Sequence, residues 1–325
     1  MGPVVSLDDV RAAAARIAPH VVRTPLERSH LLSEVCGTDV WLKFECFQHT
    51  GSFKLRGGLN AVSQLARPHV VTASAGNHGL GVARAAAVLG VRATVVVPET
   101  ASAAKVDALR RSGAELLQVG DNYDEAEHAG IRLARERGLP FISPYNDPAV
   151  VAGGGTVALE IFEDLPDVRT LVVPAGGGGL ISGVGVAAHG LDPNATVIGV
   201  QSEASPALRA ALANGRLVPV DVLPSLADGL AGNVEAGSIT FDLLRTHVRE
   251  VVLVSEAAIA DAMRWLLANE HVLVEGSGAV GAAALLGRDH RWSGPVAVIL
   301  TGRNVASSVL QGVVSSPLTP RIGAT

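Results

Sequence analysis

The chain has few aromatic residues and no long apolar run. Aromatic side chains make up 3% of its 325 residues, whereas hydrophobic residues make up 48%. Its core must therefore be built mostly from Ala, Val and Leu, which suits helices packed on a Val-rich parallel sheet. No apolar stretch approaches the roughly 20 residues that a membrane-spanning helix needs. The length exceeds the size at which one core keeps growing, so we expect two domains.

Charge and cysteine are also sparse. The net charge is −5 without any block of like charges, so nothing attracts a nucleic acid or an anionic membrane surface. Two cysteines, Cys36 and Cys46, make neither a disulfide framework nor a metal site, and suit a reducing cytoplasm. The N-terminal segment has no secretory signal and instead predicts a capped helix from Ser6 or Leu7. We therefore expect a cytoplasmic protein without nucleic-acid or membrane partners, and without an appended regulatory domain.

Short apolar runs alternate with helical segments along most of the chain. The first series predicts strands at 69–74, 91–98 and 114–119 and helices at 78–90, 102–113 and 123–138. The second predicts strands at 170–176, 195–200, 250–254 and 295–302 and helices at 179–190, 204–215 and 256–270. Each connection between parallel strands needs a dozen or more residues and is right-handed. The pattern predicts an α/β fold of two parallel-sheet lobes, with a candidate hinge near residues 140–150.

Three of the predicted strands run into small residues at their carboxyl ends, where ligands of open α/β sheets bind. The segments that follow them are AGNHG, GGGGL and TGRN. The second contains Gly176–Gly179, whose backbone could wrap a phosphate without Cβ atoms in the way. A tight turn that needs positive φ is the alternative. The glycine spacing is not that of a dinucleotide-binding fingerprint.

Lys54 is one of only three lysines, and it lies in the turn TGSFKLRGG. We expect the other two, Lys43 in an alternating strand and Lys105 in an amphipathic helix, to be solvated. Ser52 can cap a helix that begins with Phe53, which would place Lys54 at the positive end of the helix dipole. Such a position lowers the pKa of a lysine. It favours a nucleophile or Schiff-base former over a structural lysine.

A Schiff-base lysine together with a glycine cup for phosphate suggests pyridoxal 5′-phosphate. The motifs TGSFKLRGG, SAGNHG, GGGGL and TGRN, in this order and at these spacings, resemble those of fold-type II pyridoxal-phosphate enzymes, in particular the threonine/serine dehydratase (ammonia-lyase) and serine racemase group. The similarity extends over nearly the whole chain. It implies the two-lobed parallel-sheet architecture of the tryptophan synthase β-like enzymes, with a large cofactor-binding domain at 1–65 and 147–325 and a small domain at 66–146. It also implies a homo-oligomer, either a dimer or a tetramer.

The resemblance implies a role for each matching residue. Lys54 would form the Schiff base with the cofactor, Phe53 would lie against one face of its ring, Asn77 would bind its phenolic oxygen and Thr301 would meet its pyridine nitrogen. The phosphate would be held by Gly176, Gly177, Gly178 and Gly179 with the Leu180 N–H, and the substrate carboxylate by the loop Ser74, Ala75, Gly76, Asn77 and His78. Lys54 and Ser74 would be catalytic. Phe53 and Thr301 could instead be core and sheet residues, and His78 could be structural.

The hydroxyl of Thr301 bears on the reaction type. A carboxylate at this position would keep the pyridine nitrogen protonated, whereas a neutral hydroxyl has no charge with which to hold that proton. The shallower electron sink favours rapid loss of a β-leaving group. We therefore predict α,β-elimination of a β-hydroxy amino acid, L-threonine and/or L-serine, to a 2-oxo acid and ammonia, with Lys54 removing the Cα proton.

Other reactions in the group make different demands. Racemisation needs a second acid or base on the opposite face of Cα, but Ala75 stands where the racemase branch has a second serine, and a methyl group carries no proton. Gln201 and Ala207 stand where racemase-like members place two carboxylates. Glu203 alone would be a poor cage for a divalent cation, so no metal site is expected. The comparison favours a dehydratase over a racemase.

Some alternatives stay open. Arg303 could accept a second substrate carboxylate, as in a 3-hydroxyaspartate dehydratase, or pair with Glu275. Glu275 could line the site or cap the helix that follows it. Tyr145 replaces a smaller polar residue between the lobes. A β-replacement synthase and a non-catalytic ligand-binding relative are more distant, and intact Lys54 and Asn77 argue against the latter.

Overall fold

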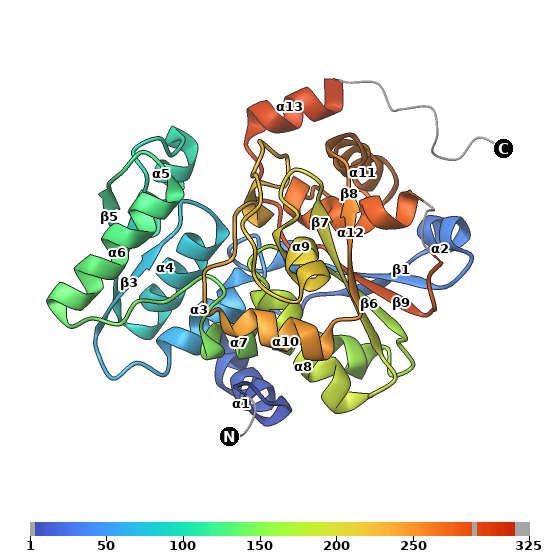
Figure 1. The fold of residues 1–325 in the computed structure, drawn as a ribbon, viewed down its shortest axis with the longest axis horizontal. Coiled ribbons are helices and arrows are strands. Elements are labelled where there is room, and N and C mark those ends of the chain that lie inside the picture. Colours follow the sequence, from blue (N-terminus) through green and yellow to red (C-terminus); the bar gives the residue numbers. More distant parts are fainter. Residues whose placement is uncertain (1–3, 288–290, 316–325) are drawn as a thin grey trace.

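The computed structural model describes residues 4–287 and 291–315, which hold two separate sheets with helices around them (Figure 1). The larger sheet has the strand order β1-β2-β9-β6-β7-β8, and the smaller has the order β3-β4-β5. Strand β1 is antiparallel to β2, and the other paired strands are parallel. The predicted α/β architecture of two parallel-sheet lobes is thereby confirmed.

The smaller sheet comprises β3 (His69–Ala73), β4 (Arg92–Val97) and β5 (Glu115–Gln118), with helices α4 (Asn77–Leu89), α5 (Ala103–Arg111) and α6 (Tyr123–Arg137). Successive side chains of β4 pack on opposite sides. Val96 joins a cluster with residues of α6, whereas Val95 and Val97 join one with residues of α4 and α5. Burial on both faces explains why these strands are continuous Val-rich runs. The predicted strands and helices of this segment are confirmed.

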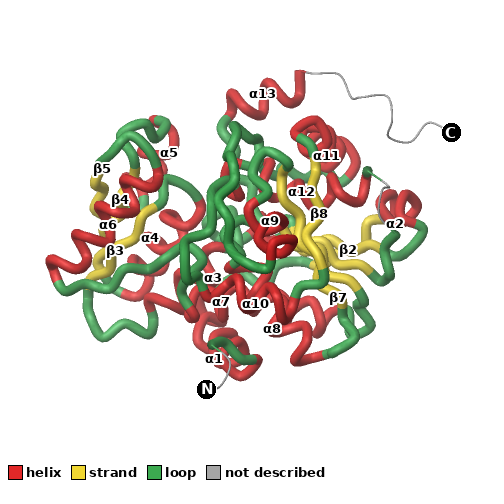
Figure 2. The backbone as a smooth tube through the Cα atoms, viewed as in Figure 1, coloured by secondary structure: helices red, strands yellow, loops and turns green. Residues whose placement is uncertain are grey.

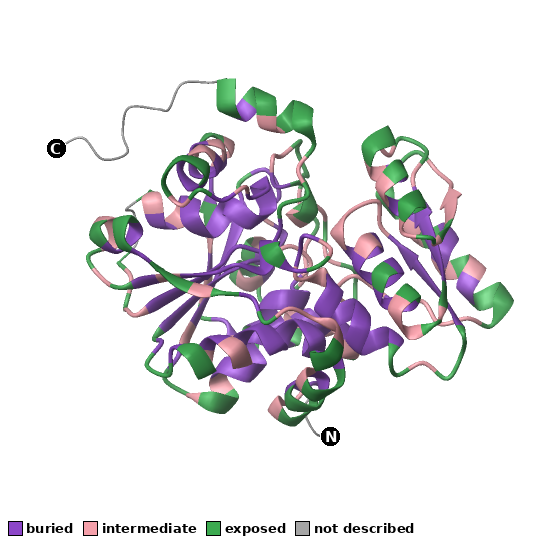
Figure 3. Ribbon diagram, turned by 180° about the vertical axis from the view of Figure 1, so that it is seen from behind, coloured by how far each residue is buried: buried purple, intermediate pink, exposed green. Residues whose placement is uncertain are grey.

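The larger sheet is also covered on both faces. Its strands are β1 (Leu26–Ser29), β2 (Val40–Lys43), β6 (Thr170–Pro174), β7 (Thr196–Ser202), β8 (Glu250–Val254) and β9 (Val296–Ile299). One cluster contains Leu171 and Val173 of β6 with residues of α1 (Leu7–Ile17), α7 (Pro148–Asp164), α8 (Gly179–Leu191), α9 (Ala207–Asn214) and α10 (Ile239–His247). The other contains Val172 with residues of α2 (His30–Cys36), α11 (Glu256–Asn269), α12 (Gly276–Leu286) and α13 (Ser307–Ser315). Figure 3 shows the resulting buried layer.

Helix α3 (Lys54–Val62) lies between the two sheets and packs on α4 and α7 (Figure 1). Glycines make this packing possible. A Cβ atom on Gly58 would lie 3.0 Å from the carbonyl carbon of Gly81 in α4, and one on Gly153 of α7 would lie 2.6 Å from the carbonyl oxygen of Arg56. The GGG run at 153–155 therefore packs closely although it forms the middle of a helix.

A buried ionic cluster holds α3 against β2 and α7. Lys43 is fully buried, and its Nζ donates to Glu160 and to the carbonyl of Thr24, both at 2.6 Å. Arg56 of α3 donates to Glu45 at 2.8 Å and to Glu160 at 2.7 Å. The expectation that Lys43 is solvated was therefore wrong. Alternation along a strand does not reveal whether the second face is covered, and here α7 covers it.

The structure also bears on the predicted N-terminal helix and on the predicted domain boundaries. Ser6 does cap α1, because its side chain accepts the N–H of Asp9. No helix in the described part of the chain is both long enough and apolar enough to cross a membrane. All three strands of the smaller sheet fall within 66–146, but the domain boundaries remain a prediction. Residues 1–3, 288–290 and 316–325 of the predicted large domain lie outside the described residues.

Candidate active site

The turn that carries Lys54 is joined to the end of β9. Ser52 pairs with Gly302 in an antiparallel bridge, and the Phe53 N–H donates to the carbonyl of Thr301 at 3.1 Å. Helix α3 begins at Lys54 with Phe53 at the N-cap, and no side chain caps it. The predicted Ser52 cap was therefore wrong. The backbone of Ser52 pairs with Gly302 after β9, and the buried hydroxyl of Ser52 has no hydrogen-bond partner.

The amine of Lys54 has lost most of its water. Its Nζ donates to the carbonyl of Pro144 at 2.8 Å, and no ion pair among the described residues includes it. Burial lowers the pKa of Lys54 to about 8, because the ammonium is disfavoured away from water. The predicted direction is confirmed, with burial as the cause. At pH 7 about one amine in ten is then neutral and able to act as a nucleophile.

The loop after β3 remains accessible between two buried elements. Ser74, Ala75 and Gly76 are half-buried, and so is Asn77, the first residue of α4. The Ser74 hydroxyl accepts the N–H of Gly76 at 3.1 Å. This contact makes a small turn at the positive end of α4, where backbone N–H groups have no partner within the helix.

His78 is buried in the first turn of α4. Its Nε2 lies 3.2 Å from the carbonyl of Ile142, to which it must donate, so Nδ1 is an acceptor. That Nδ1 is buried without a hydrogen-bond partner. Burial and then the nearby charge of Lys54 lower the pKa of His78 to about 3. The imidazole is therefore neutral at physiological pH, and only one of its nitrogens is satisfied.

The glycine run after β6 makes a turn with positive φ and leads directly into the N-terminus of α8. Gly178 has a φ of 93° and occupies the N-cap of α8. The first turn of that helix, which includes Leu180, leaves N–H groups without intrahelical partners. A Cβ on Gly177 would lie 2.4 Å from the ring of Tyr145, and one on Gly176 would lie 3.0 Å from Cα of Leu230. The loop needs glycine both for its conformation and for these close approaches.

Thr301 is buried two residues beyond the end of β9. It is 3% exposed, and its hydroxyl lies 3.5 Å from the carbonyl of Ser277. No carboxylate accepts a hydrogen bond from this hydroxyl among the described residues. The polar group at this end of the strand is therefore neutral.

Glu275 binds Asn77 and does not cap the helix that follows it. It stands at the N-cap of α12 without capping that helix, and its Oε1 accepts Nδ2–H of Asn77 at 2.6 Å. Burial raises the pKa of Glu275 to about 7, although the hydrogen bond from Asn77 opposes this shift. The alternative of an Arg303–Glu275 pair was also wrong. The exposed guanidinium of Arg303 lies 5.5 Å from the ring centroid of Phe47.

Contacts join the predicted segments into one region where loops gather between the sheets (Figure 2). The Lys54 turn meets Thr301 through the Phe53 N–H, and Asn304 donates to Asn77 at 2.7 Å. The glycine run meets the segment after Pro144 through Tyr145, whose hydroxyl accepts the N–H of Glu235 at 3.2 Å.

Sequence reasoning missed several members of this region. The carbonyl of Pro144 and the side chain of Asn304 were not singled out, although Asn304 belongs to the TGRN motif. A third is the 3-10 helix η3 (Asp228–Leu230), which follows an irregular segment without periodicity. Lys105 of α5 is exposed as expected, and it reaches Asp228 of η3 at 2.8 Å. No sequence pattern indicated that this contact links the two sheets.

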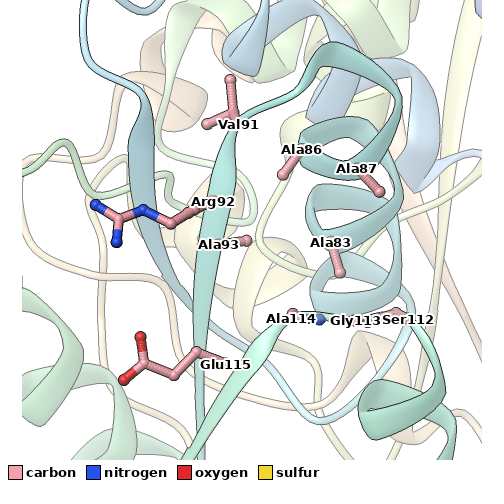
Figure 4. A pocket seen from close by; sticks show the side chains of 10 residues that line it. All are labelled: Ala83, Ala86, Ala87, Val91, Arg92, Ala93, Ser112, Gly113, Ala114 and Glu115. Carbon is pink, nitrogen blue, oxygen red and sulfur yellow. Dashed lines mark hydrogen bonds between the residues drawn. The ribbon is translucent and has the colours of Figure 1, made fainter.

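Other features lie outside this region. Oε1 of Gln201 accepts the N–H groups of Leu208 and Arg209 in the first turn of α9. The described residues contain no group of three or more His, Cys, Asp or Glu side chains that could hold a metal ion. A cavity of about 230 Å³ lies among α4, β4 and the start of β5, with Ala86 of α4 turned toward the strand and the side chains of Arg92 and Glu115 extending away from the helix (Figure 4). None of the predicted site residues lines it.

Comparisons with known proteins identify relatives of this chain. The family model described as "Pyridoxal-phosphate dependent enzyme" matches residues 17–302. The L-threonine ammonia-lyase of Thermotoga maritima is 43% identical over 319 residues, which cover 97% of this chain and 79% of that protein. The structure of maize serine racemase has a TM-score of 0.90 at 34% identity, covering 95% of this chain and 96% of the other. The processed form of threonine deaminase isoform 2 from Solanum lycopersicum has a TM-score of 0.89 at 34% identity, covering 94% of this chain and 86% of the other.

Proposed function

Because the chain belongs to the pyridoxal-phosphate dependent enzyme family, we propose that it is an ammonia-lyase that converts L-threonine, and also L-serine, to a 2-oxo acid and ammonia. The observation that carries this proposal is the amine of Lys54. Burial leaves part of this amine uncharged, and its one hydrogen-bond partner among the described residues is a backbone carbonyl. The residues just before its helix pair with the segment after β9, which carries the neutral hydroxyl of Thr301. These properties suit a lysine that binds the cofactor and then moves a proton.

The residues present fit the cofactor. The glycine run offers a cradle that side chains would fill, at the N-terminus of a helix that favours a phosphate. Two buried polar atoms near Lys54, the hydroxyl of Ser52 and Nδ1 of His78, lack hydrogen-bond partners. Buried polar groups normally have partners, so a polar ligand or ordered water is expected beside them.

We assign the predicted roles on this basis. Lys54 would hold the cofactor covalently, Phe53 would lie against its ring, Asn77 would donate to its phenolic oxygen, Thr301 would meet its ring nitrogen, and Gly176, Gly177, Gly178, Gly179 and the Leu180 N–H would hold its phosphate. When bound, pyridoxal phosphate supplies an electron sink that acidifies the Cα proton of an attached amino acid. The protein has to hold the substrate, take that proton and limit the side reactions.

The protein groups that would perform these tasks are neutral or weakly charged. The Ser74–His78 loop would hold the substrate carboxylate at the start of α4. The amine of Lys54 would take the Cα proton, which requires its uncharged form and therefore a lowered pKa. Thr301 has no charge with which to keep a proton on the ring nitrogen. Its hydroxyl therefore favours prompt loss of a β-hydroxyl group over a long-lived carbanion.

Serine racemase is the second candidate, because its structure resembles this one closely. Racemisation requires a proton donor on the face of Cα opposite Lys54. Ala75, which stands where the racemase branch has a serine, cannot supply one. A 3-hydroxyaspartate dehydratase is less favoured, because Arg303 is exposed and lies over Phe47. These observations support the ammonia-lyase.

A substrate panel tests the proposal. The protein with added pyridoxal phosphate is incubated with the L and D forms of threonine, serine and 3-hydroxyaspartate, and 2-oxo acid, ammonia and the enantiomers are measured. We expect ammonia and 2-oxo acid from L-threonine, lost in Lys54→Ala and kept in the matched Lys105→Ala. Interconversion of L- and D-serine that outpaces ammonia release, or no product from any member, would overturn the proposal.

We further propose that the protein is a homodimer or homotetramer in the cytoplasm, with domains at 1–65 with 147–325 and at 66–146. Family resemblance supports the assembly and the compartment. The confinement of the smaller sheet to 69–118 supports the division of the chain. Light scattering of the purified protein tests the assembly, and a monomer at micromolar concentration would contradict it.

A further inference from the structure

The side-chain amide of Asn77 is held at both ends. Its Nδ2 donates to Oε1 of Glu275 at 2.6 Å, and its Oδ1 accepts Nδ2–H of Asn304 at 2.7 Å. An asparagine amide offers two N–H hydrogens and one acceptor oxygen. One N–H of Asn77 is therefore left over after these two contacts.

The two partners also fix which way the amide faces. Above the pKa of Glu275, which is about 7, its ionised carboxylate can only accept a hydrogen bond and so selects the nitrogen of Asn77. The orientation of the Asn304 amide is also fixed, because its Nδ2 donates both to Asn77 and to the carbonyl of Thr50, the latter at 2.8 Å. An amide without such partners can flip and exchange its oxygen for its nitrogen. Here a flip would place two acceptors and two donors against each other.

Glu275 is itself seated by the backbone. It is 7% exposed, and its N–H donates to the carbonyl of Gly302 at 3.0 Å. A Cβ on Gly302 would lie 2.3 Å from Oε1 of Glu275 and 3.1 Å from Nδ2 of Asn77. The glycine of the TGRN motif therefore leaves room for this carboxylate and for its contact with Asn77.

We propose that Glu275 and Asn304 are positioning residues that keep the remaining N–H of Asn77 directed at the phenolic oxygen of pyridoxal phosphate. This inference rests on the proposed function, because it takes Asn77 as the residue that binds that oxygen. Neither Glu275 nor Asn304 needs to touch the cofactor. Both act through the orientation of one amide, since a flipped Asn77 would present its own oxygen to an oxygen.

A double-mutant cycle tests whether Glu275 acts through Asn77. The dissociation constant for pyridoxal phosphate and the absorption maximum of the bound cofactor are measured in wild type, Glu275→Gln, Asn77→Ala and the double variant. Gln can donate as well as accept, so it no longer selects the nitrogen of Asn77. We expect about a tenfold weaker affinity and a shifted absorption in each single variant. The double variant should match Asn77→Ala, because no amide is left to orient.

Controls separate positioning from general damage. Glu256→Gln alters another hydrogen-bonded carboxylate, at the start of α11, and should change neither readout. Asn304→Ala provides a second arm, and it too should add nothing once Asn77 is absent. An unchanged affinity and spectrum in Glu275→Gln, or a full additional loss in the double variant, overturns the inference. Cofactor binding is measured without substrate, so a wild type that binds cofactor but releases no ammonia would instead count against the proposed function.

Discussion

Nζ of Lys54 donates a 2.8 Å hydrogen bond to the carbonyl oxygen of Pro144, a residue ninety positions further along the chain. A carbonyl stabilises an amine in either protonation state, so it does not force the charge that a carboxylate would. The contact also places the turn that carries Lys54 against the segment that returns from the smaller sheet. The burial that lowers the pKa of Lys54 therefore depends on how the two sheets are arranged.

The first prediction concerns the rate at which the cofactor-free protein takes up pyridoxal phosphate. Only the neutral amine attacks an aldehyde, and the pKa of Lys54 is lowered to about 8. The uptake rate should therefore rise with pH and reach half its maximum near pH 8, as followed by absorbance. Lys54→Arg keeps a positive charge without a nucleophile and should show no covalent uptake. A midpoint near the ordinary lysine value of about 10.4 would contradict the prediction.

The second prediction concerns acid stability and His78. Its pKa is about 3 in the folded protein, below its ordinary value of 6.5, so the unfolded chain binds an extra proton between these values. The free energy of unfolding should therefore fall as the pH drops from 6.5 toward 3. Urea unfolding at a series of pH values should show a weaker fall in His78→Gln than in wild type. Carboxylates titrate in both proteins, so parallel curves would rule out a contribution from His78.

The third prediction concerns the buried ionic cluster. Glu45 is fully buried and accepts hydrogen bonds from Arg56 and from Thr24. Glu45→Gln leaves buried cations in excess and should lower the free energy of unfolding by about 3–5 kcal/mol. Arg23→Ala removes a pair of exposed ionic contacts and should cost less than about 1 kcal/mol. Chemical denaturation measures both, and equal losses would be inconsistent with the buried network described here.

The fourth prediction concerns Gly178. Its backbone has a φ of 93°, which residues with a side chain rarely adopt. A Cβ atom at this position would also lie 2.9 Å from side-chain atoms of both Leu244 and Thr240. Gly178→Ala should destabilise the protein by about 1–3 kcal/mol and weaken the affinity for pyridoxal phosphate. Gly215→Ala is the matched control, because it also has positive φ but has open space around its Cβ position. It should reduce stability without changing cofactor affinity, and an equal loss of affinity in both variants would argue against a phosphate site at Gly178.

The alternation of strands and helices was predictable because it is a local property. Runs such as 92–97 are buried on both faces of a parallel sheet, so they appear as continuous Val-rich segments. The burial of Lys43 was not predictable in this manner. Whether the second face of β2 is covered depends on α7, whose Glu160 lies more than a hundred residues away. The GGG run inside α7 would also normally argue against a helix, and its close packing explains it, with Gly153 against α3 and Gly155 against α8.

The residues of the candidate site that lie in recognisable sequence motifs could be predicted. Lys54, Asn77 and the glycine run were identified from their own segments, and the contacts bring these segments together. The partners of these residues were not predicted. Ser52 failed as a cap because its backbone pairs with Gly302, and Glu275 turned to Asn77 instead of capping its own helix. Such contacts depend on tertiary structure and leave no periodic signal in the sequence.

The most direct test of the account is the identity of the residue that holds the cofactor. The protein is saturated with pyridoxal phosphate, treated with borohydride to make the bond permanent, and digested for peptide mass spectrometry. The account predicts a single modified peptide, with the cofactor mass on Lys54 and not on Lys43 or Lys105. Modification of another residue, or an unmodified Lys54 in protein that carries the cofactor, would contradict it.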